Sequence, residues 1–440
     1  MNGSSLRSRL RDLVSTGTRP TMVGAEPAVP RSIGHVTEVL GGTVCEVAGG
    51  CCVVVDRWYT PDSLHGDLTV GFCAESVRRN LGHLSVLGAA PGGYIQSAEP
   101  TVQFFDLETT GLAGGAGTYA FLVGFGAFVN DSFRTRQFFL TGYGIEGPLL
   151  RAVADWMTTA DVLVSFNGRA FDASVLETRY LFQRLPVPFS DMPHVDMLHA
   201  SRRLWSGGEG CSLRSLEETL VGVSRNGDIP GSEIPARYVQ YVRTGDARVL
   251  VPVFEHNRLD LLSLASLTSI AVRLVEDGAR GTRDARECLG LGRLFERVGL
   301  NDRATACYAR AATDRTPGAR EVRVEALRRL ARRLRRERRH SAAADAWQQI
   351  LALGAAEQAG SPARQPRWGA LAVTREAVHA LAVHHEHRLG DLHTARSFAV
   401  RAITAAASDT HRTEARHRLA RLDRKLGMEH AERGRALFEG

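Results

Sequence analysis

Residues 101–112 read TVQFFDLETTGL, and they join an apolar run directly to two closely spaced acids. The apolar part, 101–105, predicts a buried strand. Because strand side chains alternate between faces, Asp106 and Glu108 are expected on one face of that strand. Two buried like charges are costly unless a cation lies between them, so the pair indicates a metal site. An isolated pair of this kind is also compatible with two solvated acids at a strand edge.

The residues after this pair favour a close approach of the backbone to a ligand. Thr109 and Thr110 carry hydroxyl groups, and Gly111 permits backbone conformations that other residues avoid. Thr109 is therefore a candidate substrate-binding residue.

A second apolar run, 162–166, predicts another buried strand, and an amphipathic helix is expected to follow it. Asp172 falls at this strand-to-helix junction, where it could be a metal ligand or the N-cap of the helix. Asn167 could position the substrate, although an Asn before a glycine is equally expected in a turn. Phe171 could wedge against a terminal base or belong to the core.

Residues 255–270 predict a long helix with leucines at regular intervals. His256 and Asp260 are four residues apart, so they share a face of this helix. An imidazole one turn from a carboxylate is the arrangement expected of a general base beside a metal ligand. An ion pair on a solvated helix face is the alternative.

Taken together, these segments resemble the three exonuclease motifs of the DEDD superfamily: D-x-E-T-T-G at 106–111, S-F-N-G-x-x-F-D at 165–172, and His256 with Asp260. The closer resemblance is to the YprB-like branch, which includes the mitomycin repair factor exonuclease. It extends to SLRSLE at 212–217, DIPG at 228–231 and Asn257, and covers about residues 99–275. The interval between His256 and Asp260 resembles the tyrosine subtype, because histidine subtypes usually have one residue more.

The resemblance implies an α/β fold of the ribonuclease-H-like type, a mixed sheet flanked by helices, with a divalent-metal-dependent 3′–5′ exonuclease activity. It also implies a role in DNA repair on nucleic acid that is single-stranded or has free 3′ ends, with DNA favoured. The carboxylates alone predict only phosphodiester hydrolysis. A structure-specific endonuclease remains an alternative, as does a catalytically silent nucleic-acid or protein scaffold, although a silent copy would need none of the motif residues.

Four carboxylates without cysteine ligands favour hard divalent ions, so the expected cofactor is Mg²⁺ or Mn²⁺. Two such ions can clamp a scissile phosphate, one activating water and the other stabilising the leaving oxygen. His256 would accept the proton of the attacking water, and Glu108 is assigned to catalysis as well as to metal binding. The predicted metal ligands are Asp106, Glu108, Asp172 and Asp260.

Two further segments have features of a functional site. Asp196 follows Pro193 in a short run expected to reach the same end of the sheet, where it could support the ligands without being one. Residues 142–147 fit G-x-G-x-x-G, but Asp161 precedes the next apolar run instead of ending it. Pro148 is better explained as the first residue of a helix, so dinucleotide binding is disfavoured.

The net charge of +7 comes almost wholly from arginine, because Lys425 is the only lysine in 440 residues. Residues 320–339 hold ten arginines against three glutamates. A basic surface of this size suits a phosphate backbone, and a solvated helix face is the alternative.

Seven cysteines without a C-x-x-C motif favour a reducing compartment. No apolar segment follows the early arginines, and polar residues interrupt the apolar stretch at 261–275, so neither secretion nor a membrane span is expected. The expected location is the cytoplasm, with association with the nucleoid as an option.

The chain divides into four predicted parts: a flexible N-terminal arm (1–34), a small β-rich region (35–98), the exonuclease domain (99–277) and, after a linker, a helical domain (284–440). In the last part, segments starting near 299, 338 and 390 share alanines and bulky residues at similar intervals. They resemble degenerate tetratricopeptide helix pairs, which usually present a concave surface to a partner. A helicase or another repair protein is the expected partner.

Overall fold

The computed structural model describes residues 33–88, 101–111, 117–205, 210–316, 318–360 and 368–438. The predicted N-terminal arm lies outside these residues, except for its last two positions, which begin helix α2 (Ile33–Leu40).

A seven-stranded mixed sheet forms the centre of the N-terminal half, in the order β1-β2-β7-β6-β5-β8-β9. The strands from β1 to β5 in this order are antiparallel to their neighbours, whereas β5, β8 and β9 run parallel. This is the mixed α/β sheet predicted for a ribonuclease-H-like fold. The strands are β1 (Thr43–Val47), β2 (Gly50–Tyr59), β5 (Val102–Thr109), β6 (Ala120–Val129), β7 (Ser132–Phe139), β8 (Val162–Ser165) and β9 (His194–Asp196).

The region from residue 35 to 98 is not a separate β-rich unit where the structure describes it, because β2 pairs with β7 along seven residues of the main sheet. A second small hairpin, β3 (Leu64–His65) and β4 (Leu68–Thr69), packs against the backbone near Val221. Gly66 has a left-handed backbone conformation at this contact, with φ +60°, and a Cβ there would lie 2.0 Å from the Val221 carbonyl oxygen. Helices α3 (Val70–Arg79) and α4 (Leu84–Gly88) complete this region.

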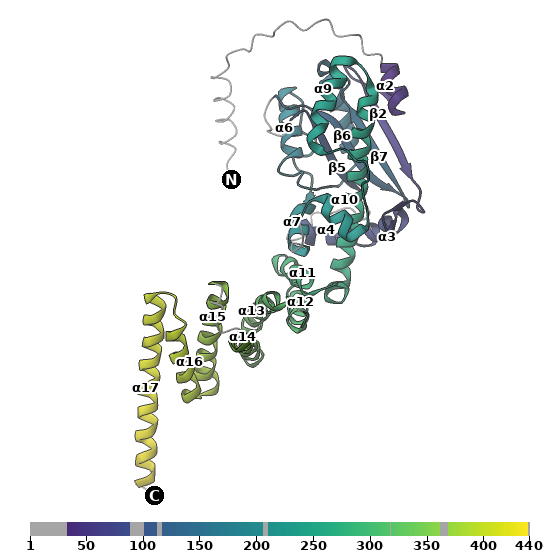
Figure 1. Ribbon diagram of the computed structural model, residues 1–440. Coiled ribbons are helices and arrows are strands. Elements are labelled where there is room, and N and C mark those ends of the chain that lie inside the picture. Colours follow the sequence, from purple (N-terminus) through teal and green to yellow (C-terminus); the bar gives the residue numbers. More distant parts are fainter. Residues whose placement is uncertain are drawn as a thin grey trace, which may run out of the picture.

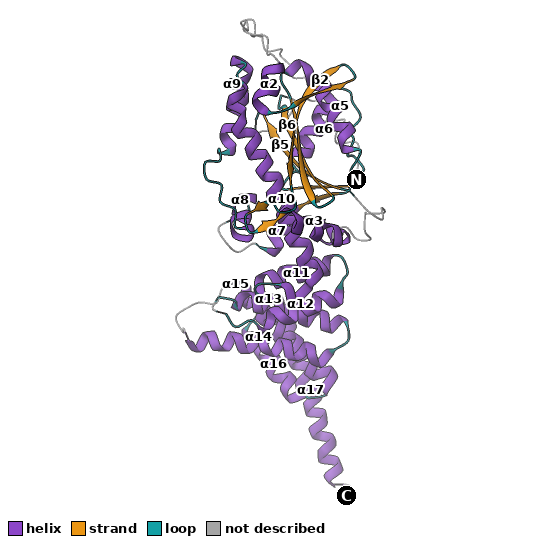
Figure 2. Ribbon diagram, turned by 90° about the vertical axis from the view of Figure 1, so that its right-hand side faces the viewer, coloured by secondary structure: helices purple, strands orange, loops and turns teal. Residues whose placement is uncertain are grey.

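Helices cover both faces of the sheet (Figure 2). In that view α5 (Glu146–Met157) and α6 (Asp172–Phe182) lie on one side, and α9 (Ile234–Thr244) lies on the other. The long helix α10 (Val251–Asp277) packs against β5 and β6 and includes the helix predicted from residue 255. Pro148 is the third residue of α5, not the first as predicted. Among the described residues, no helix is both long and apolar enough to cross a membrane.

In the described part of the chain, seven α-helices follow α10 and extend away from the sheet (Figure 1). Three turns recur at the predicted repeat positions: Gly299, Arg338 and Gly390 have φ of +81°, +61° and +67°, and each precedes the next helix by two residues. Helical hairpins therefore repeat as expected, while the tetratricopeptide assignment stays a prediction. The helices are α11 (Ala285–Arg297), α12 (Asn301–Thr313), α13 (Arg320–Arg336), α14 (His340–Gly360), α15 (Trp368–His384), α16 (Leu392–Thr404) and α17 (Asp409–Phe438).

The helical part is packed onto the sheet part, because one hydrophobic cluster runs from Phe104 of β5 to Trp347 of α14. Helix α11 lies close against α7 (Met197–Leu204), because a Cβ at Gly290 would lie 1.9 Å from the Arg203 carbonyl oxygen. Residues 278–283 therefore connect two elements of one continuous core.

Four arginines of the run on α13 contact polar side chains of neighbouring helices, and phosphate binding by the run stays a prediction. Arg328 and Arg332 both bind Glu376 of α15, with Arg–carboxylate distances of 2.8 and 2.6 Å. Arg329 binds Glu325 and Glu296, and the buried Arg333 binds Asn301 and Glu337. These four arginines bridge neighbouring helices.

Candidate metal and catalytic centre

Strand β5 carries the first two predicted ligands. Asp106 and Glu108 lie inside β5, which extends beyond the predicted apolar run at 101–105 as far as Thr109. The register of β5 with β6 shifts only after Glu108, so the alternation that puts both acids on one face holds between them. Thr109 is buried, and its hydroxyl donates to the Gly111 carbonyl oxygen at 2.9 Å. That hydroxyl proton is used in the turn that follows the strand.

Asp106 is held from α10 by Asn257, a fully buried residue to which sequence reasoning gave no role. Asn257 Nδ2 donates to Asp106 Oδ2 at 2.8 Å, and its Oδ1 accepts from Gln137 Nε2 at 2.9 Å. Gly124 pairs with Asp106 in the sheet and makes room for this contact, since a Cβ there would lie 2.2 Å from Asn257 Oδ1.

Asp172 is the first residue of α6, and Phe171 takes the N-cap position, so the capping alternative for Asp172 is wrong. The turn before it needs a glycine: a Cβ at Gly168 would lie 2.8 Å from Asp172 Oδ2. Asn167 is exposed and has φ +64°, which agrees with the turn interpretation. Phe171 is half-buried in the same segment.

Asp196 supports this turn from β9. Its buried carboxylate accepts the backbone N–H groups of Asn167 and Arg169 at 2.8 and 3.3 Å, and that of Leu198 at 3.0 Å. It therefore ties the segment before Asp172 to the start of α7, as a supporting acid is expected to do.

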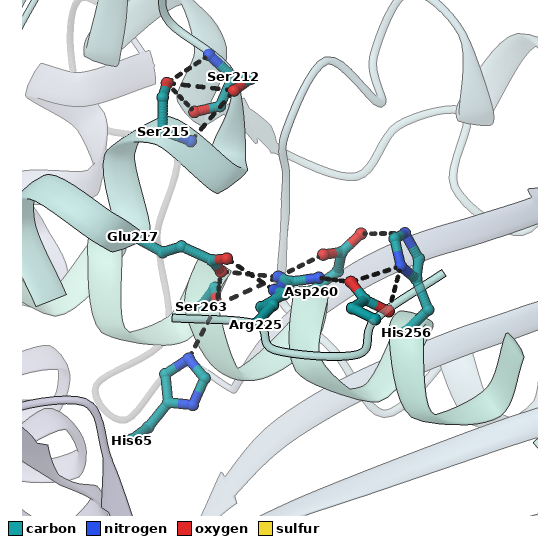
Figure 3. A network of polar contacts seen from close by, with 9 residues as sticks. His65, Ser212, Ser215, Glu217, Arg225, His256, Asp260 and Ser263 are labelled. Carbon is teal, nitrogen blue, oxygen red and sulfur yellow. Dashed lines mark hydrogen bonds and ion pairs between the residues drawn. The ribbon is translucent and has the colours of Figure 1, made fainter. Parts of the chain in front are cut away.

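His256 lies between two carboxylates (Figure 3). Its Nδ1 is 2.9 Å from both oxygens of Asp228, and its Nε2 is 3.6 Å from Asp260 Oδ2. Asp228 belongs to the similar segment at 228–231, but its place opposite His256 does not follow from the sequence. Since the side chains of His256 and Asp260 are 16% and 20% exposed, this i, i+4 pair does not lie on a solvated helix face.

The buried Arg225 contacts the same two carboxylates, Asp228 and Asp260, from the side opposite His256 (Figure 3). Its guanidinium is 2.6 Å from Asp260 Oδ1 and 3.3 Å from Asp228 Oδ2. Sequence reasoning did not single out Arg225, because one arginine among many carries no local signal of burial.

The four predicted ligands share one electrostatic environment. Burial raises the pKa of Asp106 well above its ordinary value, and the charges of Asp260 and Asp172 raise it further. Glu108 is affected in the same way by burial and then by Asp106 and Asp260. Burial, followed by Asp196 and Asp260, raises the pKa of Asp172 to about 7. Elements far apart in sequence thus bring the acids close enough to repel one another.

A comparison with known proteins finds a similarity in this part of the chain. Residues 103–272 match the family model described as the RNase_H superfamily. The match begins in β5 and ends in α10, so it includes all four predicted ligands, His256, Asp228 and Arg225. Similarity to this superfamily indicates a nuclease-type function.

The chain is also similar to a bacterial protein. Over 196 residues the chain is 32% identical to the "Uncharacterized protein YprB" of Bacillus subtilis (strain 168). The aligned part is 44% of this chain and 47% of that protein, so the chain spans about half the length of this relative.

The four predicted ligands fit a divalent cation in type and charge. Within the described ranges, however, no three His, Cys, Asp or Glu side chains converge as closely as metal ligands would. Asp106 is bound to Asn257 and Asp260 to Arg225, so each already has one oxygen engaged. The excess of buried negative charge is the feature that a cation would relieve.

Proposed function

We propose that this protein is a divalent-metal-dependent 3′–5′ exonuclease that hydrolyses phosphodiester bonds of nucleic acid, with DNA favoured. The observation that carries the proposal is the mutual repulsion of buried Asp106, Glu108 and Asp172 beside Asp260, all within the part of the chain that matches the RNase_H superfamily. Buried like charges of this kind are typical of sites built for cations and for chemistry at phosphate. The 3′–5′ direction rests on the resemblance of the three motifs to DEDD exonucleases.

Asp106, Glu108, Asp172 and Asp260 would hold two Mg²⁺ or Mn²⁺ ions, because oxygen ligands without sulfur suit hard cations. Bound there, the ions supply an activated water and neutralise the charge that develops on the phosphate and on the leaving oxygen. Asn257 holds Asp106 in place for this task through the 2.8 Å hydrogen bond to Oδ2.

His256 serves as the general base in this proposal. With its Nδ1 proton donated to Asp228, the imidazole presents Nε2 as the nitrogen that can take a proton from the attacking water. Nε2 lies on the side of Asp260, 3.6 Å from Oδ2. The carboxylate of Asp228 fixes this tautomer and stabilises the imidazolium that forms.

Thr109, Asn167 and Phe171 are proposed to contact the terminal nucleotide of a single strand or a free 3′ end. Asn167 is exposed and Phe171 half-buried in the turn that precedes Asp172, which suits a contact beside the acids. A role in DNA repair, with a helicase or another repair protein bound to the helical hairpins, is the proposed setting.

The proposal is tested with DNA and RNA strands labelled at either end and incubated with Mg²⁺, Mn²⁺ or EDTA. A 3′–5′ exonuclease releases a 3′ label at once and shortens a 5′-labelled strand in a ladder that EDTA abolishes. Asp106→Asn is the inactive control. Cleavage of circular strands would instead favour a structure-specific endonuclease. Binding without cleavage under all conditions would favour a silent scaffold and overturn the proposal.

A further inference from the structure

Arg225 is a buried cation beside the candidate catalytic centre. It lies in the segment between η3 (Glu217–Val221) and η4 (Gly231–Glu233), and its side chain is only 2% exposed. Figure 3 shows the guanidinium surrounded by carboxylates from this segment and from α10. A buried arginine is expected to be fully paired, so each contact constrains the position of its partner.

The contacts of Arg225 divide its guanidinium among three acids. Nη2 is 2.6 Å from Asp260 Oδ1 and 2.7 Å from Glu217 Oε2, and Nη1 is 3.3 Å from Asp228 Oδ2. Its Nε is 2.6 Å from Glu217 Oε1, an ion-pair distance without hydrogen-bond geometry. Only a planar fork reaches acids in several directions at once, whereas a lysine ammonium is a compact point charge.

We propose that Arg225 is a positioning residue that holds Asp260 by one carboxylate oxygen, Oδ1, and leaves Oδ2 for the divalent cation. The proposal rests on the proposed metal-dependent function. It differs from a purely structural ion pair because the same guanidinium also contacts Asp228, the partner of His256. One side chain thus sets the relative position of a metal ligand and of the acid that orients the base.

A chain of polar contacts fixes Arg225 from behind. Ser263 donates to Glu217 Oε2, and His65 Nε2 lies 2.8 Å from the Ser263 hydroxyl. The chain therefore runs from the β3–β4 hairpin through α10 to Asp260. Outer contacts of this kind commonly orient ligating carboxylates and set their metal affinity. Through His65, the β3–β4 hairpin thus helps to hold Arg225 at the candidate centre.

The charge of Arg225 also acts on the wider group of acids. Burial and the neighbouring acids raise the pKa of Asp106, and the positive charge of Arg225 opposes that rise. A guanidinium in this place favours ionised carboxylates, which are the form that binds a cation.

The test compares Arg225→Lys with Arg179→Lys in the full chain. Arg179 forms the matched control, because it is equally buried and makes a two-pronged ion pair with Glu146, at 2.5 and 2.6 Å. Mn²⁺ affinity is measured by electron paramagnetic resonance of free Mn²⁺, and thermal unfolding is followed in EDTA. Both variants are expected to unfold at lower temperature than the wild type. Only Arg225→Lys should bind Mn²⁺ more weakly, by about 10- to 100-fold.

Equal Mn²⁺ affinity of the wild type and Arg225→Lys, at a similar loss of stability, would overturn the positioning role while leaving the proposed function intact. A wild type that binds no Mn²⁺ would overturn the proposed function and the positioning role together. If Arg225→Lys does not fold, Glu217→Gln serves instead, because it keeps the shape of the partner and removes its charge. Weaker Mn²⁺ binding by Glu217→Gln supports the role, and unchanged binding overturns it.

Discussion

Asn257 donates a hydrogen bond from Nδ2 to Asp106 Oδ2 at 2.8 Å, directly over the backbone of Gly124. This contact links the central strand to α10, the helix that also carries His256 and Asp260. Asp106 on the strand and His256 on the helix are thereby held in a fixed relative position. The contact between Asn257 and Asp106 requires that residue 124 has no side chain, because a Cβ there would lie against Asn257. A substitution at Gly124 therefore tests it.

Gly124→Ala is expected to displace Asn257, because the added Cβ would lie 2.2 Å from its Oδ1. Overpacking in a core typically costs about 1–3 kcal/mol of the free energy of unfolding. Hydrolysis should also fall, since Asp106 loses its partner. The control is Gly144→Ala, where a Cβ meets nothing within 4 Å. Equal stability and activity of the two variants would show that Asn257 does not need this space.

Asp106→Asn and Asp260→Asn are expected to abolish hydrolysis, because each removes a charge proposed to hold an ion. Thermal unfolding with and without Mn²⁺ gives a second measurement that does not depend on turnover. A ligand that binds the native state raises its stability by mass action, so Mn²⁺ should stabilise the wild type and neither variant. Cleavage at wild-type rates by either variant would exclude that residue as a ligand.

The sequence predicts those parts of the candidate centre that depend on spacing within one strand or one helix. Asp106 with Glu108, and His256 with Asp260, are pairs whose shared face follows from strand or helix geometry alone. Asp172 needed the additional recognition of a strand-to-helix junction, and the structure brings it close enough for Asp260 to raise its pKa. Asn257 lies beside His256 in sequence, but its role depends on Gly124 across the sheet, which no local pattern shows.

Asp228 and Arg225 were not predicted because they lie in an irregular segment whose position is set by packing. The same limit applies to the arginines of α13. A count of arginines gives the charge of residues 320–339, but their partners include Glu296 and Glu376, on helices before and after that run. Charge composition therefore could not distinguish a phosphate-binding surface from bridges between helices.

Glu376→Gln separates these two interpretations of α13. It removes the ion pairs that Arg328 and Arg332 form with Glu376 and keeps both arginines, while Arg328 retains its contact with Glu325. Because the pairs are partly exposed, the loss of stability should be modest, about 1 kcal/mol. Nucleic-acid affinity and its salt dependence are expected to stay unchanged in a salt titration. Tighter binding by Glu376→Gln would mean that freed arginines can reach phosphates.

His65 predicts a pH dependence of stability. Its burial, followed by the charge of Arg225, lowers the pKa from the ordinary 6.5 to about 4. The unfolded chain therefore binds a proton more readily than the native protein, so the contribution of His65 is complete above pH 6.5 and is lost as the pH falls toward 4. Up to about 3 kcal/mol is involved, from about 1.4 kcal/mol per pKa unit.

His65→Gln is the matching variant, because its amide can still bond to Ser263 and does not titrate. Urea unfolding between pH 7 and 4 should show a smaller loss of stability for His65→Gln than for the wild type. Parallel curves for the two proteins would mean that His65 is not held neutral by burial.

Asp228→Asn tests the base more selectively than removal of His256. The amide can face Nδ1 of His256 at the same place, but its nitrogen cannot accept a proton and it carries no charge to stabilise an imidazolium. His256→Ala should lower the hydrolysis rate by about 10²- to 10⁴-fold with Mn²⁺ affinity largely retained. Asp228→Asn should give a loss in the same direction, and the double variant should be little slower than His256→Ala alone, because both residues act through one imidazole. Rates are measured at saturating Mn²⁺ and substrate. Losses that multiply in the double variant would mean that Asp228 acts by another route, such as its contact with Arg225.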